Sequence, residues 1–276
     1  MDQYGRERVW SLYGWFCGLM LCGSCFGAVS WLAWMQCLIN LFSGNDPSSG
    51  DAQRSLLNSV AYAWRAAFTV TYPVEFLCLS CSKLMVLDRM VHFVMMQSVK
   101  TLKKWNLWRR MMMSVVSLGN LVGLSANAAA AVQYQEAAAY FSESSVQYVV
   151  NNTVEGRRLF AEGRSRHQSA AKIASIQYVS EVAVLLFIVA AFPITAAACA
   201  RRIRSTFAFT GQCRSLTAVQ SAGRKLLMQI LRTAGVVFAA FLLRTIYSAM
   251  QAAAYLLQNT GTNCNSSNFC DACYNV

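Results

Sequence analysis

Three ionisable side chains lie inside segments that are otherwise apolar. Glu75 follows Pro73 in one apolar stretch, Glu181 stands near the start of another, and Arg244 interrupts a third. A charge placed in hydrocarbon costs about 2.5 to 3.5 kcal/mol on insertion scales, so such a side chain usually faces a partner or a water-filled cavity. We therefore treat Glu75, Glu181 and Arg244 as candidates for a ligand or ion pathway.

The depth of these charges suggests a pairing. Counting about 1.5 Å per residue from the expected cytoplasmic ends of their helices places Glu75 and Arg244 at a similar level. We predict a Glu75–Arg244 pair. It could be an ion pair that only stabilises the fold, or it could be part of a ligand or ion pathway. Glu181 follows closely after Lys172 in the sequence, which favours a position near the outer headgroups.

Four cysteines form two C-x-x-C pairs inside apolar segments. Cys22 pairs with Cys25 in this pattern, and Cys78 pairs with Cys81. The spacing puts both members of each pair on one helical face. Within a membrane span, cysteine acts mostly as a small polarizable apolar residue, so we interpret all four as packing residues.

The C-terminal cysteines have a different setting. Cys264, Cys270 and Cys273 lie in a polar stretch with turn-forming neighbours. Disulfides persist outside the cytosol, so we expect two of these cysteines to pair, with Cys37 as a further candidate partner. Zinc would need a fourth ligand that the stretch does not supply, and no metal site is expected.

Two glycosylation-type triplets begin at Asn151 and Asn265. Asparagine in the sequence Asn-x-Ser/Thr is the acceptor for glycans in the secretory pathway. Both triplets and the cysteine-bearing tail lie in segments that we expect on the outer side of the membrane.

A basic and aromatic segment precedes the third apolar stretch. Its cations are Lys100, Lys103, Lys104, Arg109 and Arg110, with two tryptophans among them. Such a segment is typical of a membrane interface and could attract anionic lipid head groups with about 1 kcal/mol per basic residue. The alternative is that these cations only determine which side of the membrane the segment occupies.

Composition excludes an ordinary soluble domain. Of the 276 residues, 56% are hydrophobic and only 13% are charged, whereas soluble domains have about 25% charged residues. A chain of this kind is expected to be an all-α, polytopic bundle within residues 1–258, with a polar tail at 259–276. We expect five spans, at about 12–35, 60–87, 111–135, 176–200 and 228–254.

The distribution of cations gives the orientation. Lys and Arg gather at the N-terminus, between Lys83 and Arg110, and between Arg201 and Lys225. Cytoplasmic loops carry such an excess, so we expect a cytoplasmic N-terminus and an outer tail. The net charge of +12 is explained in this way, and no nucleic-acid partner is expected.

Glycine pairs at four-residue spacing occur in the first and third spans. They are Gly14 with Gly18, Gly23 with Gly27, and Gly119 with Gly123. Small residues at this spacing let helix backbones approach closely. They suit packing within the bundle, and a homo-oligomer built on these faces is an alternative.

The sequence leaves the activity open between two classes. We find no phosphate-binding loop, catalytic triad or paired carboxylates, so we expect neither an enzyme nor a cofactor. The long outer segments favour a receptor-like or scaffold protein, in the plasma membrane or a secretory-pathway membrane. The buried charges and prolines favour a transporter or channel as the alternative. We also expect that the chain could be a fragment of a longer bundle.

Overall fold

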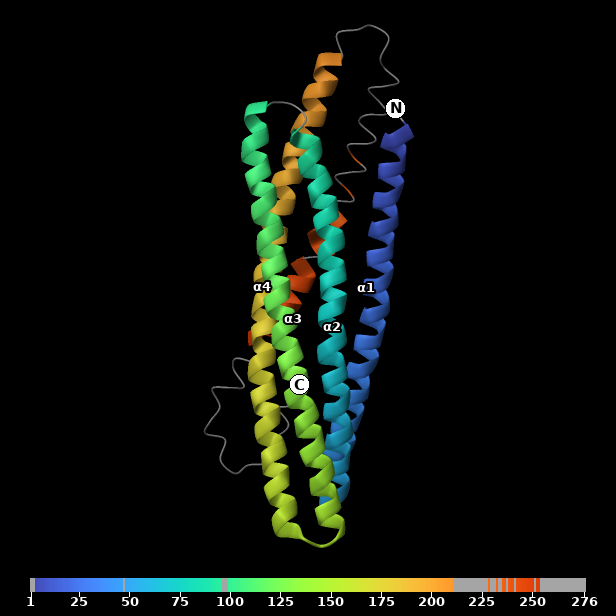
Figure 1. Cartoon of the computed structure of the whole chain (residues 1–276), viewed down its shortest axis with the longest axis vertical. Helices are drawn as coiled ribbons and strands as arrows, with labels where there is room; N and C mark the ends of the chain where they lie inside the picture. The colour runs from blue at the N-terminus through green and yellow to red at the C-terminus, as the bar shows by residue number, and fades with distance from the viewer. Residues whose placement is uncertain are drawn as a thin grey trace. The chain divides into compact units, whose positions relative to one another are not determined.

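Four long helices make up most of the structure. The computed structural model describes residues 3–46, 48–95 and 99–210, and also 228, 232, 235–236, 238–240, 242–250 and 252–253. The helices are α1 (Gln3–Gly44), α2 (Asp51–Met95), α3 (Val99–Val149) and α4 (Thr153–Thr210), as Figure 1 shows. No strand occurs among the described residues. The all-α fold class is therefore confirmed.

The first four predicted spans fall within these four helices. Each helix contains a segment that is long and apolar enough to cross a membrane: Gly14–Gly44, Asp51–Arg89, Asn106–Val149 and Thr153–Arg201. Length and composition thus indicate an integral membrane protein. The fifth predicted span includes positions outside the described residues, and its described part contains the shorter apolar helix Phe238–Met250.

The polar segments between spans are also helical. The spans predicted at 60–87, 111–135 and 176–200 leave these polar segments out. In the structure, α2 continues to Met95, α3 continues to Val149, and α4 begins at Thr153. Alanine, glutamate, glutamine and arginine are good helix formers, so a polar composition does not by itself end a helix. The helices also run through Pro73 and Pro193 without a break.

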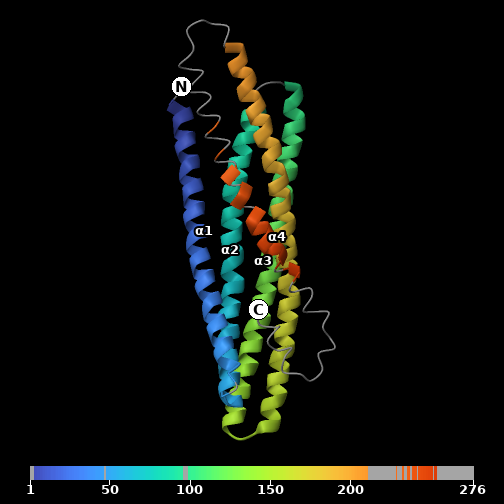
Figure 2. The same cartoon turned by 180° about the vertical axis from the view of Figure 1, so that it is seen from behind.

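The chain forms two compact units. Unit 1 comprises Met1–Leu79, Asn120–Ser180 and Met250–Val276, and unit 2 comprises Ser80–Gly119 and Glu181–Ala249. The turns α1–α2 and α3–α4 both belong to unit 1, and they lie at the same end of it in the two opposite views of Figures 1 and 2.

Within unit 1, α1 and α2 run antiparallel in one continuous register. The turn end is held by the Arg54 Nε–H, which donates to the Gly44 carbonyl at 3.3 Å. Farther along, the Trp34 and Phe68 rings lie 5.2 Å apart, and the Ser30 hydroxyl donates to the Thr71 hydroxyl at 2.9 Å. These contacts fix which residues of the two helices face one another.

Buried serines join α2, α3 and α4 near the turns. The Ser55 hydroxyl donates to the Phe141 carbonyl at 2.7 Å, and the Ser145 hydroxyl donates to the Ala52 carbonyl at 3.0 Å. The Ser144 hydroxyl donates to the Gly156 carbonyl at 2.7 Å. Hydroxyl groups that would be costly to bury unpaired thus connect neighbouring helices.

The α1–α2 turn is stabilised locally. A backbone N–H of Ser48 donates to the Asp46 carboxylate at 3.0 Å. This hydrogen bond favours the charged form and lowers the pKa of the exposed Asp46 carboxyl.

Unit 2 has its own apolar core. Its buried residues are Leu87, Met112, Ala191 and Phe192, with Trp108 and Phe187 packed against them. At the edge of this core, Arg109 of α3 forms an ion pair with Asp88 of α2. This ion pair joins two helices of unit 2.

Two of the three glycine pairs are used inside the chain. A side chain at Gly23 or Gly27 would press on Cys78 or Glu75, and one at Gly119 or Gly123 would overlap Val184 or Gln177. Nothing lies within 4 Å of a Cβ built at Gly14 or Gly18. The close approach predicted from the spacing is therefore found within each unit, and the homo-oligomer stays a prediction.

Candidate functional site

The most deeply buried charge in unit 2 is Glu181. Its side chain has 0% exposed surface, and its carboxylate accepts a hydrogen bond from the Arg244 Nε–H at 3.3 Å. The Ser248 hydroxyl also donates to the Glu181 carboxylate, at 3.0 Å. We call these three residues the Glu181 cluster. Helix α4 turns this side chain into unit 2, and the position of Glu181 near the outer headgroups stays a prediction.

Charge and spacing explain how the cluster forms. Arg244 and Ser248 are four residues apart, so they lie on one face of the helix Phe238–Met250. A buried carboxylate is tolerated when a cation and further hydrogen bonds satisfy it. The cluster can hold two helical segments together, and its ionisable groups could also exchange a proton or an ion.

Glu75 lies in unit 1, on α2. Its exposed fraction is 7%, and its carboxylate is next to Gly27, where an added Cβ would lie 3.1 Å from the carboxyl carbon. The absence of a side chain at Gly27 makes room for the carboxylate between α1 and α2. The predicted Glu75–Arg244 pair would join residues of different units and stays a prediction.

A second buried cluster surrounds Arg65 in unit 1. The guanidinium carbon lies 4.1 Å from the Trp34 ring centroid and 5.7 Å from the Tyr134 centroid. The His167 ring lies 4.7 Å from Tyr62 and 5.9 Å from Tyr134. We call these five residues the Arg65 cluster. Aromatic faces attract a cation, and the attraction grows when the group is shielded from water.

Sequence reasoning missed this cluster. The three-residue spacing of Tyr62 and Arg65 puts them on one helical face, and this was the available signal. Nothing in the sequence indicates that Trp34, Tyr134 and His167 meet this face.

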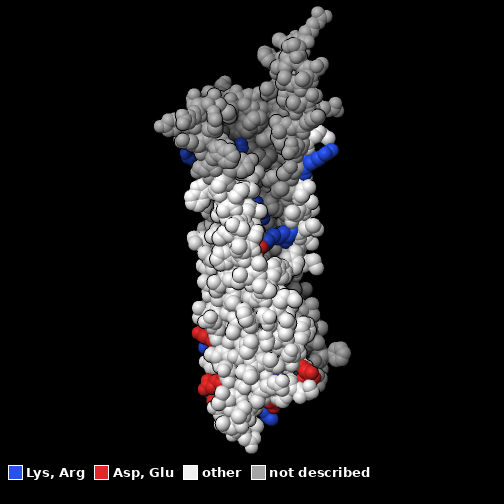
Figure 3. Space-filling model, turned by 90° about the vertical axis from the view of Figure 1, so that its right-hand side faces the viewer, with Lys and Arg blue, Asp and Glu red and all other residues white. Residues whose placement is uncertain are grey.

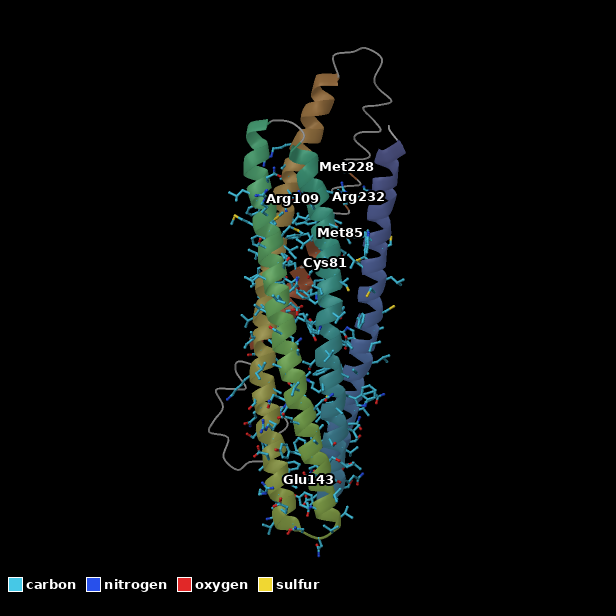
Figure 4. The ribbon with its side chains drawn as sticks, in the orientation of Figure 1. Cys81, Met85, Arg109, Glu143, Met228 and Arg232 are labelled. Carbon is cyan, nitrogen blue, oxygen red and sulfur yellow. The ribbon has the colours of Figure 1, made fainter. Side chains whose placement is uncertain are left out.

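The α3–α4 hairpin carries a network of ion pairs. Some of its residues are close in the sequence to Tyr134 and His167 of the Arg65 cluster. Arg166 of α4 lies 3.0 Å from the Glu136 carboxylate of α3 and 3.6 Å from the Glu162 carboxylate. Glu155 and Arg158 form another pair at 2.6 Å. On the face shown in Figure 3, the described charged side chains of unit 1 gather toward the end with the turns, and Figure 4 shows Glu143 there on α3.

The remaining sequence candidates are placed only in part. Arg109 and Arg110 are exposed, and Arg109 pairs with Asp88. Lys100, Lys103 and Lys104 lie on α3, and their side chains are outside the described residues. Lipid binding by this segment therefore stays a prediction.

The cysteine and glycan candidates also differ in outcome. Cys37 is a free thiol with 0% exposed surface, so the structure does not bear out its proposed disulfide. Its burial inside unit 1 separates it from the surface. Cys264, Cys270, Cys273 and Asn265 lie outside the described residues.

Asn151 lies in the turn between α3 and α4. It is exposed and has a φ of 64°. Asparagine tolerates this left-handed conformation better than most residues, which explains its place in so short a turn. The side chain is thus presented at the end of the hairpin.

Comparisons with known proteins add no family to these observations. No protein-family model, curated protein or solved structure matches the chain.

Proposed function

We propose that this chain is a receptor-like or scaffold protein of the plasma membrane or a secretory-pathway membrane. In this proposal, the α3–α4 hairpin projects from the bilayer on the outer side, opposite the basic segments. The observation that carries the proposal is the continuation of α3 and α4, as paired helices, well beyond their uncharged stretches.

The lengths along the helices support a projection. Residues 111–135 of α3 have no charge, and 25 helical residues span about 37 Å, enough for a hydrocarbon core of about 30 Å. The helix then continues from Glu136 to Val149, which adds about 20 Å. The serine hydrogen bonds and the Arg166 ion pairs hold this extension to its neighbours, and a firm extension is suited to presenting a binding surface.

The bonding of polar groups inside the units supports a structural rather than a transport role. Glu181 is bonded to Arg244 and Ser248, and Ser30 is bonded to Thr71. Polar groups that satisfy one another hold a fold together, whereas a solute pathway needs groups that bind and release what passes.

The proposed orientation predicts a glycan on Asn151. When the full chain is expressed in a eukaryotic secretory pathway, its electrophoretic mobility should increase after treatment with a glycan-removing enzyme. Asn151→Gln and Thr153→Ala should both lose the part of that shift that comes from Asn151. An acceptor triplet added at the N-terminus is the control and should stay unmodified. Modification at the N-terminus and none at Asn151 would reverse the orientation and contradict the projection.

A transporter or channel is the second candidate, and it is favoured by the presence of ionisable residues, such as Glu181 and Glu75, inside apolar segments. The purified chain in liposomes that contain a pH-sensitive dye should pass protons and potassium ions no faster than protein-free liposomes. Flux above that background that is altered by Glu181→Gln and unaltered by Arg232→Ala would favour transport instead. Arg232 is a suitable control because its side chain is exposed.

A further inference from the structure

One cysteine from each C-x-x-C pair meets the other within unit 1. The Cys78 thiol of α2 donates a hydrogen bond to the Cys22 sulfur of α1, and the two Sγ atoms lie 3.8 Å apart. Cys22 is exposed and Cys78 is half-buried, and neither is in a disulfide. The two sulfur atoms are thus in contact with no covalent bond between them.

Gly23 explains why these two thiols come so close. A Cβ built at Gly23 would lie 3.3 Å from the Cys78 Cβ and 3.3 Å from two atoms of the Leu79 side chain. The missing side chain lets the backbones of α1 and α2 approach each other beside Cys22. Such an approach is needed for a disulfide, which requires Cα atoms about 4.4 to 6.8 Å apart.

A multi-ligand metal site is not formed around this pair. Among the described residues, no group of three or more His, Cys, Asp or Glu side chains is arranged to hold a metal ion. The chemistry that two thiols in contact can carry out without further ligands is oxidation to a disulfide.

We propose that Cys22 and Cys78 are an oxidisable pair that forms a disulfide between α1 and α2, with hydrogen peroxide as the oxidant. The more exposed Cys22 sulfur attacks one peroxide oxygen, the O–O bond breaks, and the Cys22 thiol proton passes to the departing hydroxyl, so that a sulfenic acid and one water result. The Cys78 sulfur then displaces the hydroxyl from the Cys22 sulfur, which forms the S–S bond and a second water. Two thiols lose two electrons and one peroxide gains them.

The disulfide would link α1 to α2 covalently at a distance from their connecting turn. The two helices are already in contact near Gly44 and near Trp34. A bond at Cys22 would hold α1 against α2 in the part of the two helices that lies farther from their turn. Oxidation would therefore prevent α1 from separating from α2 at this point of unit 1.

The test uses the full chain with a protease site inserted between Asn45 and Gly50, in native membranes. After peroxide treatment and cleavage, the α1 fragment should migrate joined to the rest of the chain on a non-reducing denaturing gel, and a reductant should release it. The joined band should be lost in Cys22→Ser and in Cys78→Ser. Cys25→Ser and Cys81→Ser are matched controls and should keep it.

Two results would overturn the proposal. One is release of the α1 fragment from the wild-type chain after peroxide treatment. The other is a joined band that persists in both Cys22→Ser and Cys78→Ser. Circular dichroism of each purified variant establishes beforehand that it is folded. Peptide mapping of the joined wild-type band should recover a peptide that links residue 22 to residue 78, and a link between any other cysteines would equally contradict the assignment.

Discussion

Replacing Arg244 by alanine is expected to lower the free energy of unfolding by about 3 to 5 kcal/mol, the usual cost of removing one partner from a buried ion pair. The cost arises because the buried carboxylate of Glu181 loses its cation. Its carboxylate has no exposed surface, whereas the Arg244 side chain is 23% exposed. Without the guanidinium, Glu181 keeps the Ser248 hydroxyl as a donor but loses the compensating positive charge.

The two partners should therefore respond unequally. Glu181→Gln leaves Arg244, which can extend its long side chain toward a polar region, and should be the milder change. Adding Glu181→Gln to Arg244→Ala should restore part of the lost stability, because no buried charge then remains. Denaturation of the purified variants in a titration with sodium dodecyl sulfate, followed by circular dichroism, measures these differences. Equal losses for Arg244→Ala and for the exposed control Arg232→Ala would refute the buried pair.

Replacing Tyr134 by alanine is expected to be as damaging, at about 3 to 5 kcal/mol, as is usual when a large buried aromatic ring is removed. Tyr134 has 0% exposed surface. Its ring packs against the Arg65 guanidinium, the His167 ring and the Tyr62 ring, and the Tyr62 centroid is 6.4 Å away. Its loss would leave a cavity and also remove one of the aromatic faces around the cation.

Tyr134→Phe is the matched control because it keeps the ring and should cost much less. Tyr140→Ala, on the same helix but only partly buried, should also be mild. The same denaturation measurement compares the three variants. If Tyr134→Ala is no worse than Tyr140→Ala, the Arg65 cluster does not stabilise unit 1 in the way described.

The sequence predicts the helices far better than their ends. Uncharged runs of more than 20 residues identify the spans in α1 and α3, and apolar composition identifies those in α2 and α4, because the bilayer imposes that length. The spans predicted at 111–135 and 176–200 are shorter than α3 and α4, which continue to Val149 and begin at Thr153, because a span predicts only the apolar part of a helix. Inside a bundle, a polar segment stays helical when serines such as Ser55 and Ser144 and ion pairs such as Arg166–Glu136 bind it to its neighbours.

The candidate sites show a second limit. The sequence identifies Glu181 and Arg244 as unusual, because charges in apolar segments are conspicuous. A count of depth along one helix contains no information on the direction in which a side chain points, so it did not predict that Glu181 contacts Arg244 and Ser248. The Arg65 cluster depends on the register of α1, α2, α3 and α4, which no single helix encodes.

The antiparallel register of α1 and α2 has a consequence for how the length of such a chain can vary. The two helices meet at Gly44, at Trp34 and at Gly23, and each added helical residue turns the following part by about 100°. An insertion between Gly23 and Gly44 would rotate one set of contacts away from α2. Added or deleted residues should therefore be more disruptive in this part of α1 than in the α1–α2 turn, because the number of residues between these contacts must stay constant.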